Sequence, residues 1–122
     1  MTMKRITLRL GRNEGYPEGD PRQGYIIHAP LSADGSIDLE GWRDNRSACV
    51  VQRLHFDPDE RADGWLTHSG NHWRIRYDEE YEGPDEPAHR LGDHKFTPGE
   101  YVTFAHRGEE PLVYKVMEVA PL

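Results

Sequence analysis

Cysteine is almost absent from the sequence, which contains only Cys49. One cysteine excludes an intrachain disulfide and a zinc site built from several thiolates. Cys49 lies in the apolar run 49–51, which predicts a small buried side chain instead of a reactive thiol. The cysteine content therefore agrees with a reducing, cytoplasmic compartment.

Long hydrophobic runs are missing as well. No apolar stretch approaches the ~20 residues that cross a bilayer, and the first residues lack the ~7 to 15 apolar positions of a signal peptide. We therefore expect a cytoplasmic protein without a membrane segment. The chain has 122 residues, a length typical of one domain, so we predict a single domain over 1–122.

Positive charge is in deficit, because 15 Lys and Arg stand against 22 Asp and Glu and give a net charge of −7. This balance disfavours a general polyanion-binding protein, since neutralising phosphates requires clustered Lys and Arg. A local basic surface is still compatible with the composition, because recognition depends on the local field.

Sequence motifs for catalysis are also absent. No glycine-rich phosphate loop occurs, and none of the four serines lies in a Gly-x-Ser-x-Gly context. The sequence therefore indicates no cofactor. It predicts a non-enzymatic binding or interaction domain in preference to an enzyme.

Alternating apolar and polar residues are what the sequence does contain. They predict six to eight short strands, with turn residues every ~8 to 12 positions. The segment 38–45 predicts one short helix with Asp38 as its N-cap. The expected fold is all-β, a small antiparallel and partly open barrel, or a sandwich. The predicted strands are 5–10, 25–29, 48–56, 65–68, 72–77, 101–105 and 112–120.

Two polar stretches predict loops. Residues 11–24 are rich in glycine, proline and charge, and residues 78–86 carry six acidic side chains. The second strand is expected to stop before Pro30, because proline cannot donate to a central ladder. The tetrapeptide 97–100, with Pro98 followed by Gly99, is typical of a type II turn.

The parity of each strand predicts which side chains face the core. Trp73, Ile75 and Tyr77 share one face of a strand, and Val102 and Phe104 share one face of another, so we expect all five to be buried together. In the strand 48–56, the same rule predicts that Ala48, Val50, Leu54 and Phe56 lie on one face and Arg53 and His55 on the other.

Arginines on the predicted outer faces suggest a binding surface. If Arg53, Arg74 and Arg76 lie on neighbouring strands, they form a local basic face for an acidic protein or a nucleic acid. The alternative is a solvated face whose arginines pair with Asp and Glu on adjacent strands.

Histidine is frequent, with seven in the chain. His68 and His72 flank one predicted hairpin turn, and either His94 or an acidic residue of the loop 78–86 is the candidate third ligand, so a transition-metal site is the alternative hypothesis. That site would make the protein a small histidine-rich metal-dependent enzyme or sensor. Surface histidines that bind nothing explain the same pattern.

Several short motifs also carry a resemblance. The order His-Ala-Pro-Leu at 28–31, Asp-Gly-Ser-Ile-Asp at 34–38 and Pro-Gly-Glu-Tyr-Val at 98–102 resembles small all-β bacterial proteins that have no assigned activity. The resemblance implies a bacterial β domain and brings no catalytic residue. The last motif is also similar to turns in translation-factor and cupin barrels. A cupin would have a second metal-binding histidine two residues after His89. This sequence has Leu91 there and so departs from the cupin pattern.

Overall fold

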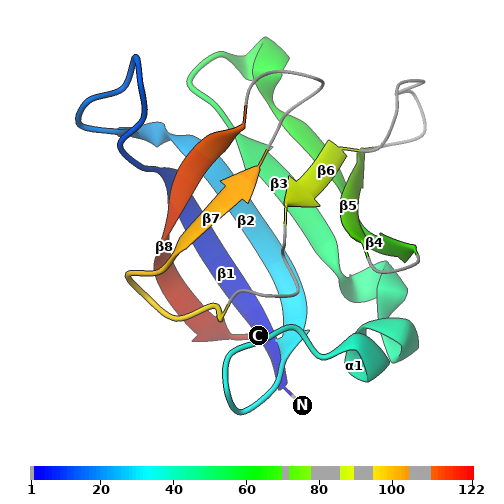
Figure 1. The fold of residues 1–122 in the computed structure, drawn as a ribbon. Helices are drawn as coiled ribbons and strands as arrows, with labels where there is room; N and C mark the ends of the chain where they lie inside the picture. The colour runs from blue at the N-terminus through cyan, green and yellow to red at the C-terminus, as the bar shows by residue number, and fades with distance from the viewer. Residues whose placement is uncertain (1, 70–71, 78–85, 90–94, 105–110) are drawn as a thin grey trace.

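We analysed a computed structural model of the chain. It describes residues 2–69, 72–77, 86–89, 95–104 and 111–122, and at 69, 72 and 86–89 it describes the backbone alone. The described residues form an antiparallel sheet that curls into a barrel, with one short helix at one end (Figure 1). The strands are β1 (Thr2–Leu10), β2 (Asp20–Leu31), β3 (Val50–Leu54), β4 (Ala62–Ser69), β5 (His72–Tyr77), β6 (Glu86–His89), β7 (Tyr101–Phe104) and β8 (Leu112–Pro121).

The strands pair in sequence order, and β8 returns to pair with β1, so the hydrogen-bonded ladder runs around the whole barrel. The ladder is thinnest at β6, which has two residue pairs with β5 and two with β7. Both chain ends lie at the same end of the barrel, because Lys4 pairs with Pro121 (Figure 1). The prediction of a small antiparallel barrel with one short helix is confirmed.

The barrel interior holds the hydrophobic core. Ile6 and Leu8 of β1 are fully buried, as the alternation in that strand predicts. The prediction for β5 and β7 is also confirmed, since all five of the expected core side chains are buried in one cluster: Trp73, Ile75, Tyr77, Val102 and Phe104.

Strand β2 extends beyond both of its predicted ends. It begins at Asp20, inside the segment predicted to be a loop, and it continues through Pro30 to Leu31. The carbonyl of Pro30 accepts a hydrogen bond from Asp38 N, on the side of β2 away from β1. The nitrogen of a strand residue points to the same side as its carbonyl, and β3 pairs only with residues 24–27 of β2. The missing N–H of Pro30 therefore costs no ladder bond.

The predicted parity of the third strand is wrong. Val51 and Arg53 of β3 face the barrel interior and are buried. By contrast, Val50 and Leu54 are partly exposed and Phe56 is 51% exposed. Apolar residues occupy both parities in this segment, so alternation alone does not identify the inner face. Phe56 follows the end of the ladder, and strand parity no longer applies to it.

The helix α1 (Leu39–Asp44) begins as the sequence predicts, with the Asp38 carboxylate accepting a hydrogen bond from Gly41 N at 3.1 Å. A 3-10 turn, η1 (Arg46–Ala48), follows it. Trp42 of α1 is buried and donates from Nε1 to the Leu66 carbonyl at 2.9 Å. This contact fixes the helix to the end of the barrel near β4 (Figure 1).

Two loop predictions have different outcomes. The turn at 97–100 is confirmed, because Gly99 has φ +98° and Glu100 N donates to the Thr97 carbonyl at 3.1 Å. The acidic loop was predicted over 78–86, but Glu86 already belongs to β6. Residues 78–85 lie outside the described part of the chain.

None of the helices that the structure describes is long and apolar enough to cross a membrane.

Candidate binding site on the outer face

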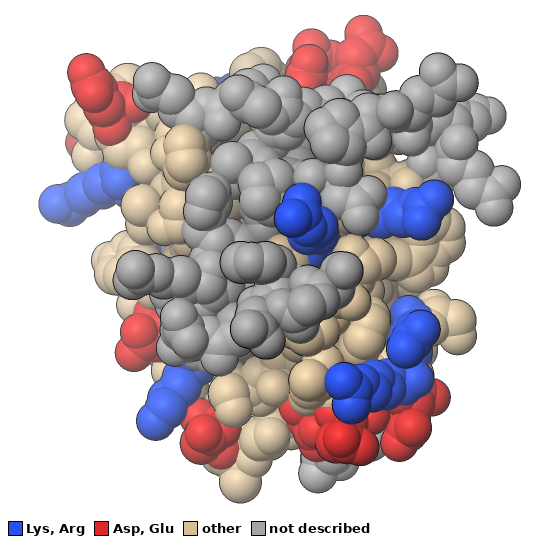
Figure 2. Space-filling view, turned by 45° about the vertical axis from the view of Figure 1, so that its right-hand side comes forward, with Lys and Arg blue, Asp and Glu red and all other residues tan. Residues whose placement is uncertain are grey.

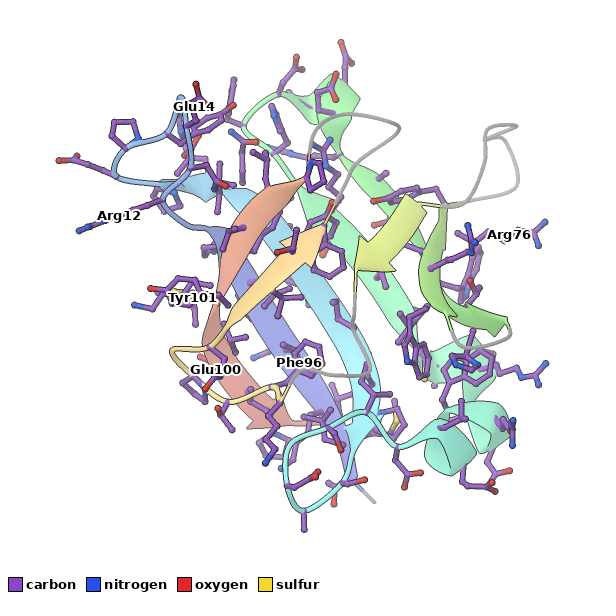
Figure 3. The ribbon with its side chains drawn as sticks, in the orientation of Figure 1. Arg12, Glu14, Arg76, Phe96, Glu100 and Tyr101 are labelled. Carbon is purple, nitrogen blue, oxygen red and sulfur yellow. The ribbon has the colours of Figure 1, made fainter. Side chains whose placement is uncertain are left out.

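The three arginines predicted to share a basic face lie on opposite sides of the barrel wall. Arg53 faces inward from β3 and is 5% exposed. Arg74 and Arg76 are exposed on β5, where Arg76 points away from the barrel (Figure 3). The prediction that Arg53 belongs to the same face is therefore wrong. Its register explains this, because Arg53 pairs with the inward-facing Tyr25 of β2.

Arg53 is held by the segment that follows β3. Its Nη1 donates to the Glu60 carbonyl at 2.8 Å and lies 3.3 Å from the Glu60 carboxylate. Glu60 ends the 3-10 turn η2 (Pro58–Glu60). A buried guanidinium requires a partner of opposite charge, and this one also anchors η2 to the barrel.

Trp65 on β4 accompanies the two outward arginines. It pairs across the strands with Arg76, and it is 39% exposed. Among the described residues, neither Arg74 nor Arg76 has a carboxylate within ion-pair distance. Figure 2 shows several Lys and Arg side chains on the right-hand side of this view, and Asp and Glu side chains lie beside the lower ones. An exposed aromatic ring and two guanidinium groups that form no ion pair with any described residue thus lie on neighbouring strands.

The predicted metal ligands do not form a described cluster. His68 packs between two tryptophan rings, with centroid distances of 4.6 Å to Trp73 and 5.9 Å to Trp42. The side chain of His72 and the whole of His94 lie outside the described part of the structure. Within that part, no three His, Cys, Asp or Glu side chains come together as a metal site.

Three neighbouring hollows lie on the outer face, between the C-terminal end of β3 and the helix α1. We name each after one residue. The Phe56 hollow is lined by Arg9, Arg22, Gln52, Leu54, His55, Phe56 and Arg61. The Val50 hollow is lined by Ile26, His28, Val50, Val51, Gln52, Asp63, Gly64 and Trp65. The Trp42 hollow is lined by Trp42, Arg46, Ser47, Trp65, Leu66, Thr67 and His68.

The three hollows adjoin one another. Gln52 lines both the Phe56 and the Val50 hollows, and Trp65 lines both the Val50 and the Trp42 hollows. We call the combined surface the outer track. It follows β3, whose five residues span roughly 13 Å at about 3.3 Å per residue. An extended ligand can therefore contact all three hollows at once.

Positive charge is concentrated at the two ends of the outer track. Arg9, Arg22 and Arg61 line the Phe56 hollow, and Arg46 lines the Trp42 hollow, where its guanidinium lies 4.8 Å from the Trp42 ring centroid. Among the residues that line the three hollows, Asp63 is the one acidic side chain. The track is thus more positive than a chain of net charge −7 suggests.

The carboxylate of Asp20 neutralises the charge of one of these arginines, Arg22. The carboxylate accepts hydrogen bonds from the side chain of Arg22 at 3.1 and 3.3 Å. The side-chain and backbone hydrogen bonds from Arg22, with a further one from Gln23, lower the pKa of Asp20 from 3.8 to about 2. Asp20 is buried while Arg22 remains exposed, so the arginine is oriented without being covered.

Cys49 does not contribute to a reactive site. Its side chain is fully buried, as predicted, and burial raises the pKa of the thiol to about 11. A thiol in this state is a poor nucleophile at neutral pH.

The sequence did not reveal the aromatic residues of the outer track. The alternation in 48–56 placed Phe56 on the same face as Ala48, Val50 and Leu54, and it gave no prediction for Trp65. The outward position of Trp65 follows from its neighbour Leu66, which is 1% exposed, because successive residues of a strand face opposite sides of the sheet. No comparable signal marks Phe56, which lies between β3 and η2.

Comparison with known proteins gives no relative: no family model, no curated protein and no solved structure matches this chain. Functional inference therefore depends on the geometry of the outer face.

Proposed function

We propose that this protein is a non-enzymatic domain that binds single-stranded nucleic acid along the outer track. The observation that supports this proposal is that the three hollows adjoin one another along β3 and β4, with the exposed Phe56 and Trp65 rings and several arginines among their lining residues. Proteins that bind single strands combine a positive groove with aromatic rings on which bases stack.

Each end of the outer track pairs an aromatic ring with a guanidinium group. Arg22 lies 4.6 Å from the Phe56 ring centroid, and Arg46 covers the ring of Trp42. Trp65, between these ends, presents a partly exposed indole beside Arg76. An exposed ring next to an arginine can stack on a base while the arginine contacts the attached phosphate, and in the outer track Trp65 is the ring in this position.

A single strand fits this surface better than an acidic peptide does. An acidic peptide needs cations alone, whereas the outer track also exposes the Phe56 and Trp65 rings, which carboxylates do not use. Duplex recognition through the major groove needs a protruding helix or ribbon. In the described structure the one α-helix has six residues and is fixed against β4 through Trp42.

The domain fits the cytoplasm of a bacterium in this proposal. Its lone thiol is buried and needs no oxidising environment. The resemblance of its motifs to small bacterial proteins supports the same setting.

The test is fluorescence anisotropy with labelled single-stranded RNA and DNA of about 12 nucleotides, within the site sizes of single-strand binding domains. We expect both the RNA and the DNA oligonucleotide to bind, with an affinity that falls steeply as salt is added. Trp65→Ala should weaken binding about tenfold, because stacking on one aromatic ring contributes ~1 to 3 kcal/mol.

Tyr101→Ala is the matched control. Tyr101 is 53% exposed on β7 and points outward on the side opposite to Arg76 (Figure 3), so its loss should leave binding unchanged. Equal binding by the parent and Trp65→Ala would contradict the proposal. Binding of a polyglutamate peptide, with no binding of either strand, would replace it by an acidic protein partner.

A further inference from the structure

The Phe56 hollow has a surplus of positive charge. Arg9, Arg22 and Arg61 line it, and the carboxylate of Asp20 neutralises Arg22 alone. In the described structure Arg9 and Arg61 have no carboxylate within ion-pair distance. Two uncompensated guanidinium groups at the edge of one hollow favour an anionic ligand with several oxygens.

The hollow also presents an aromatic ring to solvent. Phe56 is 51% exposed, although Arg22 lies 4.6 Å from its centroid and the His55 ring lies 4.3 Å away. The Phe56 hollow measures about 430 Å³, within the size range of small-molecule sites. Ring and charge together suit a ligand that is both aromatic and anionic.

Hydrogen bonds preorganise the walls of the hollow. Arg61 Nε donates to the His55 carbonyl at 2.8 Å, and Asp57 N donates to His55 Nδ1 at 3.0 Å. From inside the barrel, Arg53 fixes η2 through the Glu60 carbonyl. The segment that carries Phe56 and Arg61 is therefore held at both of its ends, and less ordering is required when a ligand binds.

We propose that the Phe56 hollow is a subsite for one nucleoside monophosphate unit, with the base against the exposed part of the Phe56 side chain and the phosphate at the Arg9 and Arg61 guanidinium groups. This inference rests on the proposed function and deepens it, because it states which part of the outer track holds a complete nucleotide. The unit comes from a single strand or from a free mononucleotide, and the two sources share the same chemistry.

The experiment is a titration followed by two-dimensional amide NMR, with adenosine monophosphate, inorganic phosphate and adenosine as separate ligands. Adenosine monophosphate should shift the amides of residues 52–61 and the Nε–H signals of Arg9 and Arg61. It should bind at least about tenfold more tightly than phosphate or adenosine alone, because only the nucleotide uses both the ring and the guanidinium groups. Equal affinities, or shifts confined to other regions, would overturn the inference.

Matched variants separate binding from folding. Phe56→Ala and Arg9→Ser each alter an exposed or partly exposed side chain, and each should weaken mononucleotide binding about tenfold. Tyr101→Ala and Arg12→Ser, which change an exposed ring and an exposed cation outside the outer track, should leave it unchanged. A Phe56→Ala variant that binds the mononucleotide as the parent does would also overturn the inference.

Failure of this inference is distinguishable from failure of the proposed function. Single-strand binding that depends on Trp65 but not on Phe56 would overturn the subsite and keep the outer track. Mononucleotide binding at the Phe56 hollow, with no binding of the oligonucleotides, would keep the subsite and overturn the outer track.

Discussion

The inner and outer walls of this barrel use the same residue types under different constraints. Inside, the Tyr25 ring packs 4.6 Å from Phe104, and Arg53 lies within ion-pair distance of Glu60. Outside, Trp65 is partly exposed beside Arg76, which has no described carboxylate within reach. Arg53 and Arg76 each lie opposite an aromatic residue on the neighbouring strand. Of the two, only Arg53 has a described carboxylate within ion-pair distance.

The difference follows from the cost of removing charge from water. A buried guanidinium without a partner is strongly destabilising, so the fold supplies one for Arg53. An exposed guanidinium keeps its hydration and gains little from an ion pair. Unpaired arginines are therefore tolerated only on the outer wall, where they are free to contact a ligand.

The largest difference between the two walls should appear on truncating a tryptophan. Trp73 is 7% exposed and packs 5.4 Å from Trp42, so Trp73→Ala should reduce the free energy of unfolding by about 3 to 5 kcal/mol. Trp65→Ala should cost clearly less, because 39% of that residue's surface is already in water. Urea denaturation measures both, and equal losses would show that the inner and outer walls are assigned wrongly.

A smaller effect is expected for the ion pair of the inner wall. Glu60→Ala removes the carboxylate 3.3 Å from buried Arg53 and should cost about 1 to 3 kcal/mol. Glu40→Ala is the control, since the Glu40 pair with Arg43 is exposed and its loss should cost under about 0.5 kcal/mol. Matching denaturation midpoints for the two variants would contradict the role given to Arg53.

Acid should weaken the support of Arg22 behind the Phe56 hollow. Hydrogen bonds from Arg22 lower the pKa of Asp20 from 3.8 to about 2. A lowered carboxyl pKa stabilises the fold above the unfolded value, and this contribution is lost as the pH falls from about 4 to 2. The stability gap between the parent and Asp20→Asn should shrink over that range. A gap that stays constant would contradict the assignment.

The smallest predicted effect concerns the acidic residue of the outer track. Asp63→Asn removes the negative charge from the Val50 hollow and should tighten single-strand binding about two- to fivefold, the range of a surface charge interaction below 1 kcal/mol. Glu14→Gln on the loop after β1 is the control and should have no effect (Figure 3). Weaker binding by Asp63→Asn would mean that Asp63 contacts the ligand directly.

The sequence predicted the barrel wherever apolar residues alternate without interruption. Strands β1 and β5 satisfy this condition, and their inward residues were identified correctly. Pro30 misled the prediction because a sequence does not show where the neighbouring strand ends, and β3 does not extend to that position. Strand order and ladder length are tertiary properties that local patterns do not determine.

The candidate site was only partly predictable for a related reason. Arg74 and Arg76 were identified as outward because Trp73, Ile75 and Tyr77 define the inner parity of β5. Arg53 was assigned to the outer face because Val50 and Leu54 occupy the opposite parity, and the sequence does not show that Glu60 lies within reach of its charge. A polar residue on an inner position is recognised only when its partner is known.

The salt dependence of single-strand binding tests the central claim most directly. The affinity of the parent should fall linearly on a plot of log affinity against log salt concentration, because binding releases counterions. Replacing Arg9 and Arg46, which line the two ends of the outer track, together by Ser should reduce the slope by about 1.4, or ~0.7 for each phosphate that is no longer neutralised, while the denaturation midpoint stays constant. An unchanged slope in this double variant would show that the outer arginines are only solvated, and it would contradict the account.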